Sequence, residues 1–413
     1  MMKKVLLSIL LTLLPLLASA ETVEIDGIWY NLVPKAQEAE VTSNPNKYSG
    51  IVEIPASVTY NDVKYKVTSI GISAFGGCRL TSITIPNSVT SIEESAFIGC
   101  GLTTIAIPNS VTSIGKFAFD NCKSLTSVTI PNSVASIEEA TFYECTALTS
   151  VTFSYGLTEI GSSAFYGCTS LTSVNFPNSL TSILNNAFEG CISLTSVTIP
   201  NALTTIENNA FSDCSALASV TIGSGVKTIS SHAFGNCDEL TDVYCLAEKI
   251  SGSWRGEGLY TSTDAFNNSY PQYMTLHVPA ASIEAYRSTE PWSQFKAIVP
   301  LEDGDNPEIK KCATPEISYS NGKVSLSCET EGVEFISEVT VTDAKKYYDS
   351  EFTLSQTYKI SVYATKAGYE NSDVATREIV IENGQTTLFG DLDKDGKVNV
   401  ADHVKLSDII MNK

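Results

Sequence analysis

The sequence predicts a mainly β protein with short helical turns: a long repeat solenoid, then a small two-sheet β-sandwich, then a short loop-and-helix tail. One phrase recurs eight times between about residues 70 and 240, and it is followed by short strand-like runs and by an acidic loop near the C-terminus. A phrase of fixed period is typical of a solenoid, because each unit buries its apolar face only against its neighbours.

The period is set by a phenylalanine and a cysteine. The phenylalanines lie 22 residues apart twice and then 23 apart five times, at Phe75, Phe97, Phe119, Phe142, Phe165, Phe188, Phe211 and Phe234. A cysteine follows each one three residues later, from Cys78 to Cys237. We predict free, buried thiols, since stacked turns point neighbouring cysteines the same way, which is poor geometry for a disulfide. Metal binding is the alternative, but one Cys per rung without His supplies no tetrahedral set.

Each rung is predicted to contain a strand and a turn. Leu125, Val128 and Ile130 have the L-x-x-L-x-L spacing of a leucine-rich repeat, in which alternate side chains of a short strand face inward. Pro131 then ends the strand because it has no N–H to donate. We predict a single helical turn at Glu138–Phe142. Because this strand and turn recur with a fixed period, the predicted fold class is a leucine-rich repeat solenoid.

The A-F-x-x-C and I-P-x-x-V-x-x-I phrases resemble the BspA-type family of bacterial leucine-rich repeats, over residues 58–301. This resemblance implies a non-catalytic surface protein that adheres to matrix proteins, other bacteria or glycans. Residues 21–67 lack the phrase and are expected to form the N-terminal cap, because the ends of a solenoid must differ from its interior. Residues 68–301 then form the solenoid with its C-terminal cap.

Residues 1–20 are predicted to be a secretory signal peptide. Lys3 and Lys4 precede an apolar run at Val5–Leu17 and a small-x-small site ending at Ala20, which is the order that signal peptides have. A membrane anchor is the alternative, but it needs about 20 apolar residues. We therefore expect a secreted or cell-surface chain with no membrane span after signal removal.

The chain is strongly acidic, with 26 basic and 46 acidic residues and a net charge of −20. Such a chain repels phosphate backbones, so no nucleic acid partner is expected. The expected partner is an extracellular protein or glycan.

The outward strand positions are small hydroxyl residues that are candidates for ligand contact. They include Ser127, Thr129, Ser150, Thr152, Ser196 and Thr198. They could bind an extended glycan or peptide through hydrogen bonds, or form a solvated β surface, because Thr suits strands. Both interpretations stay open. No catalytic constellation recurs on this surface, so we do not expect an enzyme.

A second candidate contact lies where the period slips. Phe266 follows Phe234 by 32 residues, so nine residues are inserted within 249–263. The insert carries Trp254 and Arg255, which are residue types favoured in interfaces. Insertions in repeat proteins often map to the binding face. The alternative is an irregular loop over the last rungs.

After a linker at 302–312, residues 313–382 show about seven short strand-like runs, which predict an immunoglobulin-like sandwich. Cys312-x-x-Pro315 and the run from Tyr358 resemble fibronectin type III-like or chitobiase C-terminal modules of bacterial exported proteins. The resemblance implies a spacer, with glycan binding as a lesser role. Cys312 and Cys328, outside the ladder, are the only pair for which we consider a disulfide.

After a second linker at 383–389, residues 390–413 carry the sharpest chemical motif. Oxygen ligands stand at loop positions 1, 3, 5, 7, 9 and 12, with a backbone carbonyl at 7: Asp391, Asp393, Asp395, Lys397, Asn399 and Asp402. This set suits calcium. A solvated acidic tail is the alternative.

The loop and following helix resemble half of a type I dockerin, which implies a cohesin-type partner. The family normally has two such segments, and Val400 and Ala401 stand where many dockerins carry hydroxyl residues. The sequence thus favours an adhesin-like binding protein. The alternative is a non-catalytic subunit of an extracellular polysaccharide-handling assembly, docked through this tail.

Overall fold

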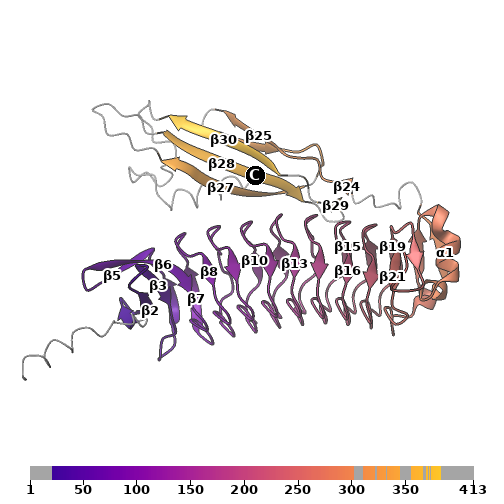
Figure 1. Ribbon diagram of the computed structural model, residues 1–413, viewed down its shortest axis with the longest axis horizontal. Coiled ribbons are helices and arrows are strands. Elements are labelled where there is room, and N and C mark those ends of the chain that lie inside the picture. Colours follow the sequence, from indigo (N-terminus) through magenta and orange to yellow (C-terminus); the bar gives the residue numbers. More distant parts are fainter. Residues whose placement is uncertain are drawn as a thin grey trace, which may run out of the picture.

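The computed structural model describes residues 21–301 and, beyond them, 310–320, 323–331, 333–344, 355–365, 369, 370, 372 and 374–382. The repeats form one long row of rungs, and the C-terminal strands lie along one of its long edges (Figure 1). The signal peptide at 1–20 and the tail at 390–413 fall outside the described residues, so both stay predictions. Within the described ranges, no helix is long and apolar enough to cross a membrane.

The N-terminal cap changes from antiparallel to parallel pairing as it meets the repeats. Its strands are β1 (Glu21–Ile25), β2 (Ile28–Val33), β3 (Glu38–Val41), β4 (Ser49–Glu53), β5 (Ser57–Tyr60) and β6 (Val63–Ile70). β1, β2 and β3 pair antiparallel, whereas β3 pairs parallel with β6 and β6 with β8 of the first rungs. The cap therefore ends in β6, a strand with which the first rung strand β8 can pair in parallel.

The rungs carry parallel strands on two faces, and each face is divided into more than one sheet. Face A consists of β7 (Arg79–Thr84), β10 (Ser127–Thr129), β12 (Ser150–Thr152), β15 (Ser196–Ile199), β17 (Ser219–Ile222), β19 (Asp242–Cys245), β22 (Thr275–Val278) and β23 (Ala297–Pro300), with β4 beside β7. Face B consists of β8 (Ser91–Ile92), β9 (Ser113–Ile114), β11 (Ser136–Ile137), β13 (Glu159–Ile160), β14 (Ser182–Ile183), β16 (Thr205–Ile206), β18 (Thr228–Ile229), β20 (Ile250–Ser251) and β21 (Leu259–Thr261).

Two edges join the faces. The proline edge comprises the turns after the face A strands, such as Pro131–Ser133, and the phenylalanine edge comprises the turns such as Glu138–Cys145. The predicted helical turn at Glu138–Phe142 is wrong. Ala140 and Glu144 have φ of 52° and 48°, and Phe142 N–H donates to Ala164 O of the next rung at 2.8 Å. Left-handed residues break the helix, so these N–H groups bond between rungs.

The helices of the described residues lie in the C-terminal cap. They are η1 (Pro271–Tyr273), η2 (Ala280–Ser282), α1 (Ile283–Ser288) and η3 (Trp292–Gln294). They close the last rung, because Trp292 and Phe295 meet Phe266 edge-on at ring-centroid distances of 5.6 and 5.3 Å. At the opposite end Tyr48 lies 4.9 Å from Phe75. Aromatic residues therefore cover the ring column at both ends.

The core is a column of stacked phenylalanine rings. Consecutive centroids from Phe75 to Phe266 lie 5.1–5.6 Å apart, with planes within 14° of each other. The eight repeated phenylalanines are at most 1% exposed. Aromatic contacts add to the free energy gained by burial, so each rung stabilises its neighbours.

The cysteine column lies beside the rings, and all of its thiols are buried and free. The thiol of Cys145 donates to Phe119 O of the preceding rung at 3.2 Å, and the thiol of Cys168 donates to Phe142 O at 3.2 Å. The same bond recurs from Cys122 to Cys237. A small apolar residue with a weak donor satisfies a buried carbonyl there, a role that the sequence did not indicate.

The C-terminal part forms small sheets around a core of its own. Its strands are β24 (Lys310–Lys311), β25 (Glu316–Ser320), β26 (Lys323–Ser327), β27 (Glu334–Ala344), β28 (Ser355–Thr365), β29 (Tyr369–Glu370) and β30 (Ala375–Glu382). β25 pairs with β26, and β28 lies between β27 and β30, all antiparallel. Ile317 of the first sheet packs with Ile360, Val362 and Ile379 of the second.

Two details differ from the sequence predictions. Two of the strand-like runs expected within 313–382, Val333–Ile336 and Val339–Val341, fall on the single strand β27 apart from Val333, which precedes it. The disulfide considered between Cys312 and Cys328 is not formed: neither sulfur is bonded to another sulfur, and the Cys328 thiol donates to Ala313 O at 3.0 Å.

Candidate functional site

The predicted hydroxyl residues of face A form ladders, because the parallel register places equivalent residues side by side. Ser127 pairs with Ser150 and Thr129 with Thr152. Ser196 and Thr198 belong to a second sheet, β15–β17–β19–β22–β23, where they pair with Ser219 and Thr221. The six candidates therefore fall into two groups on the described strands of face A. One group lies on β10 and β12, and the other is Ser196 with Thr198 on β15.

These side chains face outward on a polar surface. Ser127, Thr129, Ser150 and Ser196 are exposed, and Thr152 and Thr198 are half-buried. The valines between them, such as Val128 and Val197, are buried. The period-two alternation therefore holds, and face A offers rows of small hydroxyl groups to a ligand.

At the C-terminal end of face A the ladder changes its chemistry. β19 continues the outward positions with Asp242 and Tyr244, and β22 places His277 beside Tyr244. The Tyr244 and His277 rings stack at 4.3 Å with 15° between their planes. His277 Nε2 lies 3.1 Å from Asp242 Oδ1. We call these three residues the Tyr244 cluster.

The Tyr244 cluster is held by its own contacts. Asp242 Oδ2 also accepts a hydrogen bond from Thr241 Oγ1 at 2.8 Å, so both carboxylate oxygens have donors. The His277 side chain is 11% exposed, and its Nδ1 has no hydrogen-bond partner within the described residues. An aromatic ring, a carboxylate and a histidine therefore meet at one end of a hydroxyl ladder, which makes the cluster a candidate contact site.

The sequence reasoning missed this cluster. Tyr244 falls at the position that Thr198 and Thr221 occupy in the preceding rungs. The departure from Thr was the available signal. His277 follows the insert, outside the regular period, so only the register of β19 with β22 brings it to Tyr244.

Trp254 and Arg255 lie elsewhere. The inserted loop leaves face B at β20 and returns at β21, so it is not part of the face A ladders. Trp254 is 70% exposed, and the Arg255 guanidinium carbon lies 4.5 Å from the centroid of its ring. This cation–π contact orders two exposed side chains and makes the loop a separate contact candidate.

Two stacked tyrosines mark the phenylalanine edge. Tyr143 and Tyr166 have ring centroids 4.8 Å apart and planes 4° apart, and both are half-buried. Burial raises the pKa of Tyr143 and also the pKa of Asp120 and Glu189. This edge provides a matched comparison for face A.

Within the described residues, serine, histidine and aspartate meet in the turn that follows β18. Ser231 Oγ lies 2.7 Å from His232 Nδ1 and donates to Asp264 Oδ2 at 2.7 Å, while Asn267 meets His232 Nε2 at 3.2 Å. A catalytic relay needs serine on one imidazole nitrogen and aspartate on the other. Here serine and aspartate share the same side of the ring.

The Asp264 carboxylate acts as an acceptor in this cluster. Partial burial acts to raise its pKa, but hydrogen bonds from Ser262 and Ser231 outweigh that effect and the net shift is downward. Its geometry supports a structural polar cluster. In the portion of the chain that the structure describes, no three His, Cys, Asp or Glu residues are placed to hold a metal ion. The calcium-loop residues Asp391–Asp402 and the rest of the tail are outside that portion.

The residues that form the rungs also match a family model. Residues 56–168 and 136–251 match the model of the BspA type leucine rich repeat region, in six copies. Residues 56–251 are thus similar to BspA-type repeats. The match ends at residue 251, whereas face A of this repeat region continues through β22 and β23. No curated protein matches the chain.

Solved structures with leucine-rich repeats are similar to the chain. A leucine rich cell surface protein from Faecalibacterium prausnitzii has 24% identity and a TM-score of 0.32, with 55% of this chain and 95% of that chain covered. The T. pallidum leucine rich repeat protein has 26% identity, a TM-score of 0.37, and coverage of 53% and 91%. The pneumococcal vaccine antigen PcpA has 17% identity, a TM-score of 0.33, and coverage of 68% and 99%.

Proposed function

We propose that the protein is a secreted or cell-surface, non-catalytic, adhesin-like protein whose face A binds an extracellular glycan or protein. The observation that carries this proposal is the Tyr244 cluster at the end of the hydroxyl ladder. The ladder supplies hydrogen-bonding groups along an extended ligand, and the stacked rings supply an apolar anchor beside the Asp242 carboxylate. Anchors of this kind provide most of the binding energy in an interface.

The match to BspA-type repeats supports a role in binding, and the similar F. prausnitzii structure is that of a leucine rich cell surface protein. We further propose the domain boundaries given above, with residues 313–382 as an immunoglobulin-like or fibronectin III-like spacer. The antiparallel pairing of β25–β26 and of β27–β28–β30 supports this assignment.

Replacement of Tyr244 and His277 by threonine should weaken ligand retention by about tenfold or more. Threonine is the residue of the equivalent positions 198 and 221, so the rung should stay folded while the aromatic anchor is lost. The measurement is binding of the mature chain to an array of oligosaccharides and extracellular matrix proteins, with and without the two substitutions.

Tyr166→Ser on the phenylalanine edge is the matched control, because Ser212 is its counterpart two rungs on. It removes one ring of an equally stacked pair and should leave array binding unchanged. Equal losses in both variants, or array binding that the double substitution does not weaken, would contradict a site on face A.

We also propose that the tail loop binds calcium through Asp391, Asp393, Asp395, Lys397, Asn399 and Asp402, and that it docks a cohesin-type module. The oxygen ligand pattern supports this second role. Calorimetric titration with calcium should show one site that Asp393→Ala weakens by at least about tenfold. Retention on an immobilised cohesin module should require calcium, and retention that persists in a chelator would contradict the docking role.

A further inference from the structure

The fourth rung departs from the repeat phrase at the proline edge. Five rungs place asparagine directly after proline, at Asn87, Asn109, Asn132, Asn178 and Asn201. The fourth rung instead reads Phe153-Ser154-Tyr155-Gly156. Among the seven rungs from residue 85 to residue 225, only this one has an aromatic residue at the asparagine position.

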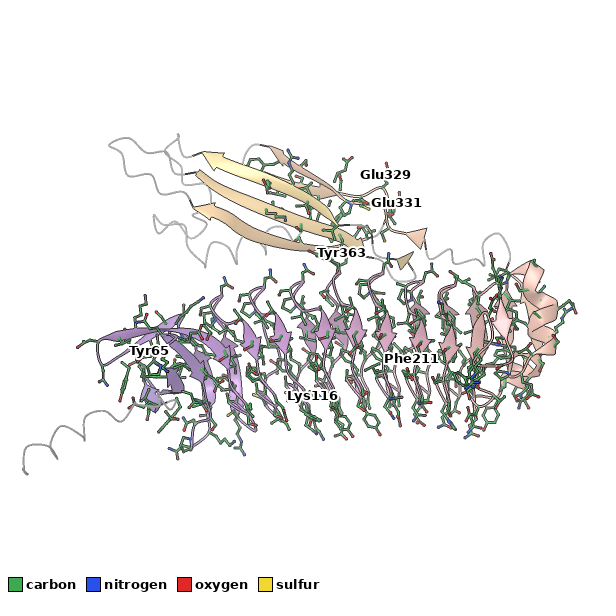
Figure 2. The ribbon with its side chains drawn as sticks, in the orientation of Figure 1. Tyr65, Lys116, Phe211, Glu329, Glu331 and Tyr363 are labelled. Carbon is green, nitrogen blue, oxygen red and sulfur yellow. The ribbon has the colours of Figure 1, made fainter. Side chains whose placement is uncertain are left out.

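This aromatic residue meets the C-terminal sheet. Tyr363 of β28 donates from its hydroxyl to Phe153 O at 2.7 Å. Its ring lies edge-on to the Tyr155 ring, with centroids 5.6 Å apart and 78° between planes. Figure 2 shows Tyr363 between the sheet and the rungs. Residues more than 200 positions apart are thus joined by a hydrogen bond and a ring contact.

The acceptor is a carbonyl that the ladder cannot satisfy from the next rung. Two rungs later Ile199 O accepts from Gly223 N at 3.1 Å. The equivalent donor for Phe153 O would be position 177, which is Pro177, and proline has no N–H. A hydroxyl from another part of the chain therefore meets a backbone group that would otherwise need a different donor.

β28 is buried on both sides at this point. Val362 and Ala364 are 0% exposed, and Val362 packs in the core of the C-terminal sheets. Tyr363, which alternation places on the opposite side, is only 1% exposed. Burial raises the pKa of the Tyr363 hydroxyl. The side of the sheet that carries Tyr363 therefore has a partner, and that partner is the proline edge of the fourth rung.

We propose that Phe153–Gly156 is a docking site for the chain's own C-terminal sheet, with Tyr155 as the residue that selects the fourth rung and Tyr363 as the docked group. Docking holds the sheet along the proline edge and leaves the hydroxyl ladders of face A open. The departure from the repeat phrase is then a specific recognition element, separate from the proposed ligand site.

Nitration of tyrosines in the mature chain tests this docking. In the wild type, Tyr363 should react slowly and Tyr273, which is 72% exposed, should react fast. Tyr155→Asn restores the residue of five other rungs, so the repeats should fold. It should raise the nitration rate of Tyr363 by about tenfold, the factor that one ring contact provides together with part of a hydrogen bond. Peptide mass spectrometry measures each rate.

Tyr166→Asn is the matched control, because it makes the same change on the opposite edge and should leave Tyr363 slow. Tyr319, which is half-buried against the small core of the sheets, reports whether the sheets stay folded, and its nitration rate should be the same in every variant. An unchanged Tyr363 rate in Tyr155→Asn, a fast Tyr363 in the wild type, or a parallel rise at Tyr319 would each overturn the proposal.

Discussion

Phe165→Ala should lower the free energy of unfolding by about 3–5 kcal/mol, the usual cost of emptying a fully buried aromatic position. Phe165 is 0% exposed. Its ring stacks on Phe142 at 5.2 Å and on Phe188 at 5.1 Å, and meets Phe153 edge-on at 5.8 Å. The substitution therefore interrupts the ring column in mid-array. Guanidinium denaturation followed by circular dichroism measures the change.

Two variants set the scale for this result. Tyr166→Ala removes a neighbouring ring that is half-buried at the surface, and it should cost about 0.5–1.5 kcal/mol. Phe165→Leu keeps much of the volume and should fall between the other two. If Phe165→Ala costs no more than Tyr166→Ala, the ring column is not what couples the rungs.

The free energy of unfolding should also decrease steeply in alkaline solution. Burial raises the pKa of Cys145 and Cys237 to about 12 and that of Cys245 to about 11, from an ordinary 9.0. Burial also raises the pKa of Cys168, Cys191 and Cys214 well above that value. Thiols of the unfolded chain lose their protons at a lower pH than the buried thiols of the folded chain. Below about pH 9 both states keep these protons and the free energy of unfolding is unaffected. It decreases as the pH rises toward 11–12.

Each such thiol should lower the free energy of unfolding by about 1.4 kcal/mol per pH unit in that window. Denaturation curves between about pH 8 and 11 measure the slope. Tyrosines with raised pKa add to the slope, so the test is a difference. Replacing Cys145 and Cys168 by alanine should make the slope shallower by two protons. An unchanged slope would show that these thiols ionise in the folded chain as they do in the unfolded one.

The sequence predicts the repeating architecture well because the apolar residues themselves keep the period. Phe142 and Cys145 identify a column, and Val128 identifies the inward side of a strand. The backbone of the turn was not predictable in this way. Glu138–Phe142 has helix-like spacing, but left-handed residues such as Ala140 turn its N–H groups toward the next rung. Hydrogen bonding between rungs outweighs the local preference.

The candidate site was predicted in part. Ser127 and Thr129 were expected on the outward face and lie there. The Tyr244 cluster was missed because the prediction relied on the residues that recur in the rungs. Tyr244 instead replaces the threonine found at positions 198 and 221. His277 enters only through strand pairing across the insert. The docking turn at Tyr155 was missed for the same reason, since its partner lies in another part of the chain.

The stacked rungs also set the distance between the docking site at Tyr155 and the Tyr244 cluster. Phe153 follows β12, and Tyr244 lies on β19, four rungs farther along face A. At the strand spacing of about 4.8 Å, this separation is about 20 Å. Deleting or duplicating one rung between them would shift the two features by a single step while leaving both intact. The number of rungs between them therefore sets the distance between the docked C-terminal sheet and the Tyr244 cluster.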